Sequence, residues 1–332
     1  MVRVRRLKFG DPDEGYYHVT SRCTLKAFLL HKEEKEKFIE ILQWLAGVFF
    51  VEVITYSVMT NHFHLVLKMI RQRDISDEEF EERLRRFYLG PNPTGDGVIL
   101  KHWDPYEIRS EFGNISVFMQ ELKQRFTWWY HRQHGTWGHV WGQRFHSVLI
   151  EGHEALRAVM LYVDLNSVRA NMVQRPERYP YCGLAQYLKE GQESHWLSHR
   201  LLKEVMTTWS HQGESDQVPA DPVRRYLQMV YERGLLRPVE KVEDHHVLAQ
   251  LLAGPTSRFL RPLRALSEGL IVGPKEACER MYKDRWLFYF SRFRSGRKAT
   301  PILPKAETTT DPPGESPPSP LAGLHTMKTF RS

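Results

Sequence analysis

The stretch VFFVEVITYSVMTNHFHLVLKM, residues Val48–Met69, decides the fold of this chain. Its first part, Val48–Met59, is rich in β-branched and aromatic residues and predicts a long, mostly buried strand. Thr60 and Asn61 then predict a tight turn, and His62–Met69 predicts the returning strand. The stretch therefore predicts an antiparallel hairpin inside a sheet.

The residues on either side of this hairpin predict alternating strands and helices. Further strands are predicted over Tyr16–Cys23 (YYHVTSRC) and within Val140–Ile150. Helices are predicted over Lys32–Leu45, Ser76–Leu89, Ser116–His131 and His153–Asn166. Antiparallel strands with helices set apart from them predict an α+β fold of the ferredoxin-like type, with a central antiparallel sheet.

The composition changes along the chain and predicts three regions. Residues 1–190 are dense in aromatic and periodic apolar residues and predict one packed domain. Residues 191–300 are more polar but helical in pattern, and predict a helical accessory region. Residues 301–332 are rich in proline, threonine and serine, which predicts a disordered tail.

Charge and cysteine content narrow the class of protein. The 332 residues include 47 Lys and Arg against 40 Asp and Glu, a net charge of +7 that suits a polyanionic partner. The three cysteines are far apart, which argues against a disulfide framework or a cysteine-based zinc site. No apolar run reaches the roughly 18 residues of a membrane span, and no secretory signal is visible, so we expect a cytoplasmic protein with no membrane partner.

The two histidines of the hairpin are a candidate metal site. Residues i and i+2 of a strand point to the same face, so His62 and His64 project together while Phe63 faces the core. Two adjacent imidazoles provide half of a typical metal site. The motif alone is equally compatible with a structural histidine pair.

A second candidate lies on the helix predicted over His153–Asn166. Tyr162 and Asn166 are four residues apart and therefore share a helix face. A tyrosine hydroxyl can act as a covalent nucleophile, and an asparagine carbonyl oxygen can bind a hard metal ion. Taken alone, the pair is more simply a buried tyrosine and an asparagine near a helix end.

The two candidates together suit one reaction. A histidine pair, a tyrosine and a third oxygen ligand are the groups needed for metal-assisted attack of tyrosine on a phosphodiester. The metal would polarise the phosphate and stabilise the leaving 3′ oxygen. The group that accepts the tyrosine proton is left open by the sequence.

Four segments in the same order resemble a known family. MTNHFHLVLK (Met59–Lys68) resembles the His-hydrophobic-His strand of HUH single-strand DNA nucleases, and LYVDLNSVRANMV (Leu161–Val173) resembles the tyrosine helix of the REP-associated tyrosine transposases. VWGQRFHSVLI (Val140–Ile150) and YHVTSRC (Tyr17–Cys23) resemble two strands of the same proteins. The resemblance covers roughly residues 10–190.

The resemblance implies a fold and a reaction. It implies an HUH domain that cleaves and rejoins single-stranded DNA through a 5′-phosphotyrosine, with Mg²⁺ or Mn²⁺ and imperfect hairpins as substrate. By position, Tyr162 matches the nucleophile, His62 and His64 match metal ligands, and Asn166 matches the third ligand. Ser167 and Thr60 stand where the family commonly has proline, which predicts altered local geometry rather than lost activity. The family includes both monomers and homodimers, and both remain open here.

Basic residues near aromatic ones are candidates for DNA contact, since arginine and lysine bind phosphates and aromatic rings stack on bases. The candidates are Lys123, Arg125, Arg132, Arg144 and Arg169. Arg3, Arg5, Arg6 and Lys8 form a basic N-terminal arm, and residues 280–298 are again basic and aromatic. Each group is also compatible with solvated surface charge.

Three functions compete at this point. The first is a tyrosine transposase that cleaves DNA. The second is a domesticated DNA-binding protein that has kept the fold without cleavage. The third, a metal-dependent hydrolase of small phosphate esters, usually needs more carboxylate ligands than the sequence places near His62 and His64.

Overall fold

The computed structural model describes residues 15–89, 105–189, 196–209, 220–231, 269–274 and 324–328. The strands are β1 (Gly15–Arg22), β2 (Val51–Val58), β3 (His62–Met69), β4 (His146–Ile150), β5 (Gly269–Pro274) and β6 (Leu324–Lys328). The α-helices are α1 (Lys32–Ala46), α2 (Asp77–Leu89), α3 (Pro105–Phe112), α4 (Ile115–His134), α5 (His153–Asp164), α6 (Asn166–Arg169), α7 (Gly183–Lys189), α8 (His199–Thr207) and α9 (Pro222–Met229). Short 3-10 turns are η1 (Thr24–Lys26), η2 (Gln72–Asp74) and η3 (Pro176–Arg178).

One mixed sheet organises the described residues, in the order β2-β3-β1-β4-β5-β6. The first four strands in this order pair antiparallel, with β1 between β3 and β4. That order and the helices after β1 and β3 are those of a ferredoxin-like fold. The predicted α+β fold with a central antiparallel sheet is confirmed.

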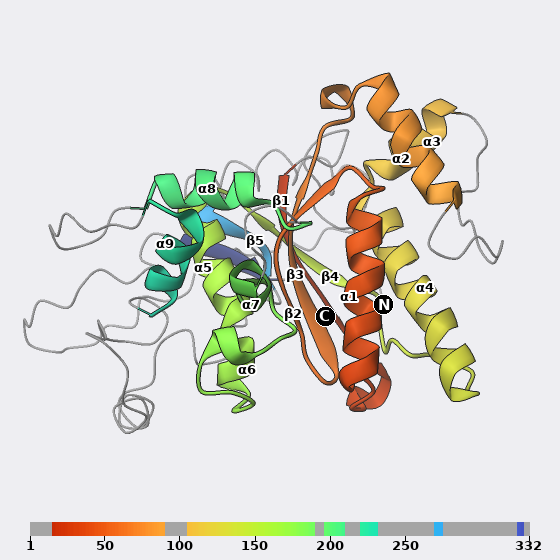
Figure 1. Cartoon of the computed structure of the whole chain (residues 1–332), viewed down its shortest axis with the longest axis horizontal. Helices are drawn as coiled ribbons and strands as arrows, with labels where there is room; N and C mark the ends of the chain where they lie inside the picture. The colour runs from red at the N-terminus through yellow and green to blue at the C-terminus, as the bar shows by residue number, and fades with distance from the viewer. Residues whose placement is uncertain are drawn as a thin grey trace, which may run out of the picture.

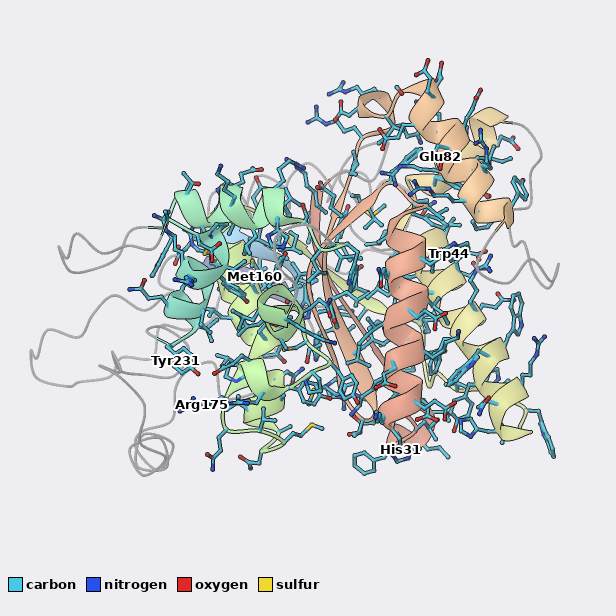
Figure 2. All side chains as sticks on the ribbon, viewed as in Figure 1. His31, Trp44, Glu82, Met160, Arg175 and Tyr231 are labelled. Atoms are coloured by element: carbon cyan, nitrogen blue, oxygen red, sulfur yellow. The ribbon has the colours of Figure 1, made fainter. Side chains whose placement is uncertain are left out.

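The helices cover both faces of the sheet (Figure 1). On one face, α1 and α4 pack together, and the Phe38 ring of α1 lies 4.6 Å from the Phe63 ring of β3. On the opposite face, α5 packs on β2 and β3. Trp44 of α1 and Met160 of α5 therefore lie on opposite sides of the sheet (Figure 2). The predicted inward orientation of Phe63 is observed.

Several elements differ from the sequence prediction. Residues 324–328, predicted to lie in a disordered tail, form β6, and residues 269–274 of the predicted helical region form β5. These strands pair with each other, and β5 pairs parallel with β4. Short strands that depend on distant partners leave little local signal. The basic N-terminal arm and residues 280–298 lie outside the described residues.

The helices that follow residue 190 pack into the same core as the sheet. Leu202 of α8 and Tyr226 of α9 are fully buried in one hydrophobic cluster that includes β2 and α5. The Trp196 ring also lies 5.3 Å from the ring of Tyr56 in β2. In the described part of the chain, no helix combines the length and the apolar character needed to cross a membrane.

Candidate active site

The histidine pair of β3 lies on the face of the sheet that α5 covers. His62 is opposite Arg22 in the β1–β3 register, and His64 is opposite Thr20. The two imidazole rings are 5.1 Å apart, as expected for side chains at i and i+2 of one strand. His62 is partly buried and His64 is only 4% exposed.

A third histidine, His18 of β1, joins this pair. Its Nε2 atom lies 2.9 Å from Nδ1 of His64, and the two rings are stacked with centroids 5.1 Å apart. The sequence analysis did not select His18. The sequence signal that could have identified it is its position in the predicted strand YYHVTSRC. His18 and Thr20 are two residues apart and share one face, and Thr20 is paired with His64.

Tyr162 projects from α5 toward these histidines. Its ring centroid lies 5.7 Å from that of His64 and 5.9 Å from that of His18, both edge-on. The helix is held in place because most of its side chains are buried, and Tyr162 itself is 4% exposed. The fold thus brings together residues that are about a hundred positions apart in the sequence.

Asn166 and Arg169 complete the site from the following turn. The helix is interrupted at Leu165, and Asn166 begins α6. The Arg169 guanidinium donates to the Asn166 Oδ1 atom, and its central carbon lies 4.2 Å from the centroid of the Tyr162 ring. The Nδ2 atom of Asn166 is buried and has no hydrogen-bond partner among the described residues.

Burial and positive charge keep the imidazoles neutral. Burial, followed by the charges of Arg22 and Arg169, lowers the pKa of His62 to about 3. Burial and the neighbouring His18 hold the pKa of His64 well below its usual value. Burial also lowers the pKa of Arg169, while its charge interaction and hydrogen bond with Tyr162 act in the opposite direction.

The donor set fits a divalent cation. The Nδ1 atom of His62 lies 2.6 Å from the Asn61 side-chain oxygen, so it carries the proton and leaves Nε2 with a free lone pair. When Nδ1 of His64 donates to His18, Nε2 of His64 is equally free. No cluster of three or more His, Cys, Asp or Glu suited to a metal occurs in the described ranges. Of the residues selected from the sequence, Asn166 could add a side-chain oxygen to the two imidazoles.

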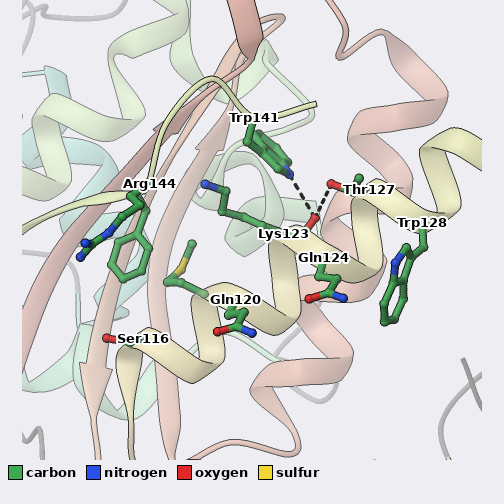
Figure 3. A pocket seen from close by; sticks show the side chains of 10 residues that line it. Ser116, Gln120, Lys123, Gln124, Thr127, Trp128, Trp141 and Arg144 are labelled. Carbon is green, nitrogen blue, oxygen red and sulfur yellow. Dashed lines mark hydrogen bonds between the residues drawn. The ribbon is translucent and has the colours of Figure 1, made fainter. Parts of the chain in front are cut away.

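The basic residues predicted to contact DNA lie in different parts of the fold. Lys123 and Arg144 line one groove beside α4 (Figure 3). Arg125 instead forms an ion pair with Glu121 at 2.8 Å and lies 4.6 Å from the Trp44 ring, in the packing of α4 on α1. Arg132 is exposed near the end of α4, and Arg169 lies in the site with Tyr162.

Comparison with known proteins finds a family match for the N-terminal part of the fold. Residues 13–78, which hold β1, α1, β2 and β3, match the family described as "Transposase IS200 like". This segment belongs to the IS200-like transposase family. The matched IS200-like segment contains His18, His62 and His64, whereas Tyr162 lies outside it. A search of curated proteins finds no match.

Two solved structures resemble the chain at low similarity. The first is a REP-associated tyrosine transposase bound to a REP hairpin, with 15% identity over 58% of this chain and 89% of that chain, and a TM-score of 0.37. The second is a protein of Deinococcus radiodurans R1 described as a transposase, with 16% identity over 47% of this chain and 92% of that chain, and a TM-score of 0.24.

Proposed function

We propose that this protein is a transposase of the tyrosine HUH type, which cleaves single-stranded DNA next to hairpins and transfers the cleaved strand. The observation that carries the proposal is the position of Tyr162, whose ring lies 5.7 Å from His64 and 4.2 Å from the Arg169 guanidinium in one buried site. A buried tyrosine that contacts neutral imidazoles and a cation has the surroundings of an activated nucleophile.

In the proposed reaction, the Tyr162 hydroxyl oxygen attacks the phosphorus of a phosphodiester. The bond from phosphorus to the 3′ oxygen breaks, and a 5′-phosphotyrosine forms. The phenol loses one proton and the released 3′ oxygen gains one, so the step is balanced without an oxidant or a nucleoside triphosphate. Rejoining is the reverse reaction, in which a 3′ hydroxyl attacks the phosphotyrosine.

Each side chain of the site has a proposed part. His62, His64 and Asn166 would hold Mg²⁺ or Mn²⁺, which polarises the phosphate and stabilises the leaving 3′ oxygen when bound. Arg169 would stabilise negative charge on the Tyr162 oxygen and on the attacked phosphate, because its largely buried guanidinium lies against Tyr162. His18 positions the ring of His64 through their hydrogen bond.

The decisive experiment is a denaturing gel of the purified full chain with Mn²⁺ and hairpin DNA labelled at either end. We expect a slow-migrating covalent band that carries the 3′-side fragment and is absent in Tyr162→Phe. Tyr88→Phe is the matched control, because Tyr88 of α2 is 39% exposed and on another part of the fold. A band that persists in Tyr162→Phe would refute the assignment of the nucleophile. Tight hairpin binding with no band for several hairpins would favour the domesticated DNA-binding protein instead.

A further inference from the structure

A groove of about 680 Å³ runs along α4, and Tyr162 is not among the residues that line it. Figure 3 shows the groove. One wall is the outer face of the helix, with Gln120, Gln124 and Trp128. The other wall is the segment that leads into β4, with Trp141 and Arg144, and Lys123 lies between the walls. The sequence analysis selected Lys123 and Arg144 as separate candidates but did not connect them.

The chemistry of the lining suits unpaired nucleotides. Among the described residues, the groove is lined by two cations and by no carboxylate, so its charge complements phosphate. Trp128 offers an indole ring on which a base can stack, whereas the Trp141 ring packs against the core rings of Phe63 and Phe126. Gln120 and Gln124 are four residues apart on one helix face and offer amide groups to base edges. A double helix would keep its bases stacked on each other and out of reach of the Trp128 ring.

Hydrogen bonds make one wall of the groove rigid. The Trp141 indole nitrogen donates to the Lys123 carbonyl oxygen at 3.1 Å, and the Lys123 ammonium donates to the Gln143 carbonyl oxygen at 2.8 Å. The Lys123 ammonium also lies 5.6 Å from the centroid of the Trp141 ring. Trp141 and Lys123 are therefore fixed as one wall of the groove, with little side-chain entropy left to lose on binding.

The groove lies at the same end of the sheet as the histidine pair. Trp141 forms an isolated bridge with Cys23, and the Gly142 amide donates to the Arg22 carbonyl oxygen at 3.0 Å. Arg22 is paired in turn with His62. Because paired strands are about 4.8 Å apart, the wall of the groove lies roughly 10 Å from the backbone of His62.

We infer that this groove binds unpaired nucleotides of the single-stranded DNA whose phosphodiester is cleaved at Tyr162. The inference rests on the proposed function for the identity of its ligand. It adds a second contact region, on the face of the sheet that α1 covers, with Trp128 stacking on a base and Lys123 and Arg144 binding phosphates.

The test is the dissociation constant of the full chain for fluorescent oligothymidine, measured by anisotropy without a divalent metal. The variants are Trp128→Ala and Arg144→Ala, because neither side chain belongs to the hydrophobic core. The matched controls are Trp137→Ala and Arg85→Ala, whose side chains are 90% and 66% exposed at other places. We expect Trp128→Ala to weaken binding about 5- to 100-fold, the range for loss of one stacked base. Arg144→Ala should weaken binding less and reduce its salt dependence, while both controls bind normally.

Three results would overturn the inference. They are unchanged binding by both groove variants, an equal loss in the controls, and a loss that appears only with oligouridine RNA. A duplex DNA probe tests the stacking, since an equal loss for duplex and single strand would show that the groove reads only phosphates. The covalent band at Tyr162 is a separate readout. If no band forms while the groove variants still lose oligothymidine binding, the inference about the groove is supported and the proposed reaction is refuted.

Discussion

The Arg169 guanidinium lies 4.2 Å from the centroid of the Tyr162 ring and donates to the side-chain oxygen of Asn166. One cation therefore contacts both Tyr162 of α5 and Asn166 of α6. Its charge also helps to hold the pKa of His62 and His64 low. Arg169 thus has charge interactions with Tyr162 and with both histidines of β3.

Replacement of Arg169 should slow cleavage more than it weakens DNA binding. We expect Arg169→Ala to lower the rate of covalent band formation about 100-fold at saturating DNA, as when a preorganised oxyanion donor is removed. Arg169→Lys keeps the charge and should recover part of the rate. Arg85→Ala, which changes an exposed arginine of α2, is the control. A purely structural role would instead appear as equal losses in the alanine and lysine variants together with a lower free energy of unfolding.

His18 is expected to act on metal binding. The His18→Ala variant removes the partner of Nδ1 in His64, so the tautomer and orientation that expose Nε2 are no longer fixed. We expect the affinity for Mn²⁺ to fall about 10- to 100-fold, measured by electron paramagnetic resonance of free Mn²⁺. His139→Ala, at an exposed histidine, is the control. Unchanged Mn²⁺ affinity in His18→Ala would remove His18 from the proposed site.

Tyr226 of α9 should stabilise the fold through Asp164. The buried Asp164 carboxylate accepts hydrogen bonds from the hydroxyls of Tyr226 and Thr55 and from the amide of Leu184. Burial raises the pKa of Asp164 to about 6, and these donors act against that rise. Tyr226→Phe deletes one donor to a buried charged group, and we expect a loss of about 1–3 kcal/mol in the free energy of unfolding by urea. Tyr88→Phe should change it by much less.

Gly183 allows α7 to approach β2 closely. A Cβ atom at this position would lie 2.9 Å from both Cα and Cβ of Thr55, and the backbone of β2 is held there by its pairing with β3 and by the packing of α5. Gly183→Ala should therefore lower the free energy of unfolding by about 1–3 kcal/mol. Gly47→Ala is the matched control, because a Cβ atom there would meet its nearest neighbour, the Trp44 carbonyl oxygen, at 3.4 Å. If both variants unfold at the same urea concentration as wild type, the close approach is not a constraint.

The sequence predicted the elements with strong periodicity. The hairpin of β2 and β3, the helix of Tyr162 and the central antiparallel sheet follow from local patterns and are found in the structure. His18 was missed because its role depends on strand register, which pairs β1 with β3 across about fifty residues. Arg125 was grouped with DNA contacts, although Glu121 one turn earlier was a visible partner for it. The strands β5 and β6 were not predicted, because each pairs with a strand that is far from it in the sequence.

Because Tyr226 and Leu202 are buried in the core of the sheet, the segments before and after residue 190 share one hydrophobic core. A fragment that stops at residue 190 would leave the Asp164 carboxylate without its Tyr226 donor and the Tyr56 ring without Trp196. The helices after residue 190 thus support α5, the helix that carries Tyr162. A truncation at residue 190 would therefore disturb the position of Tyr162 as well as the stability of the fold.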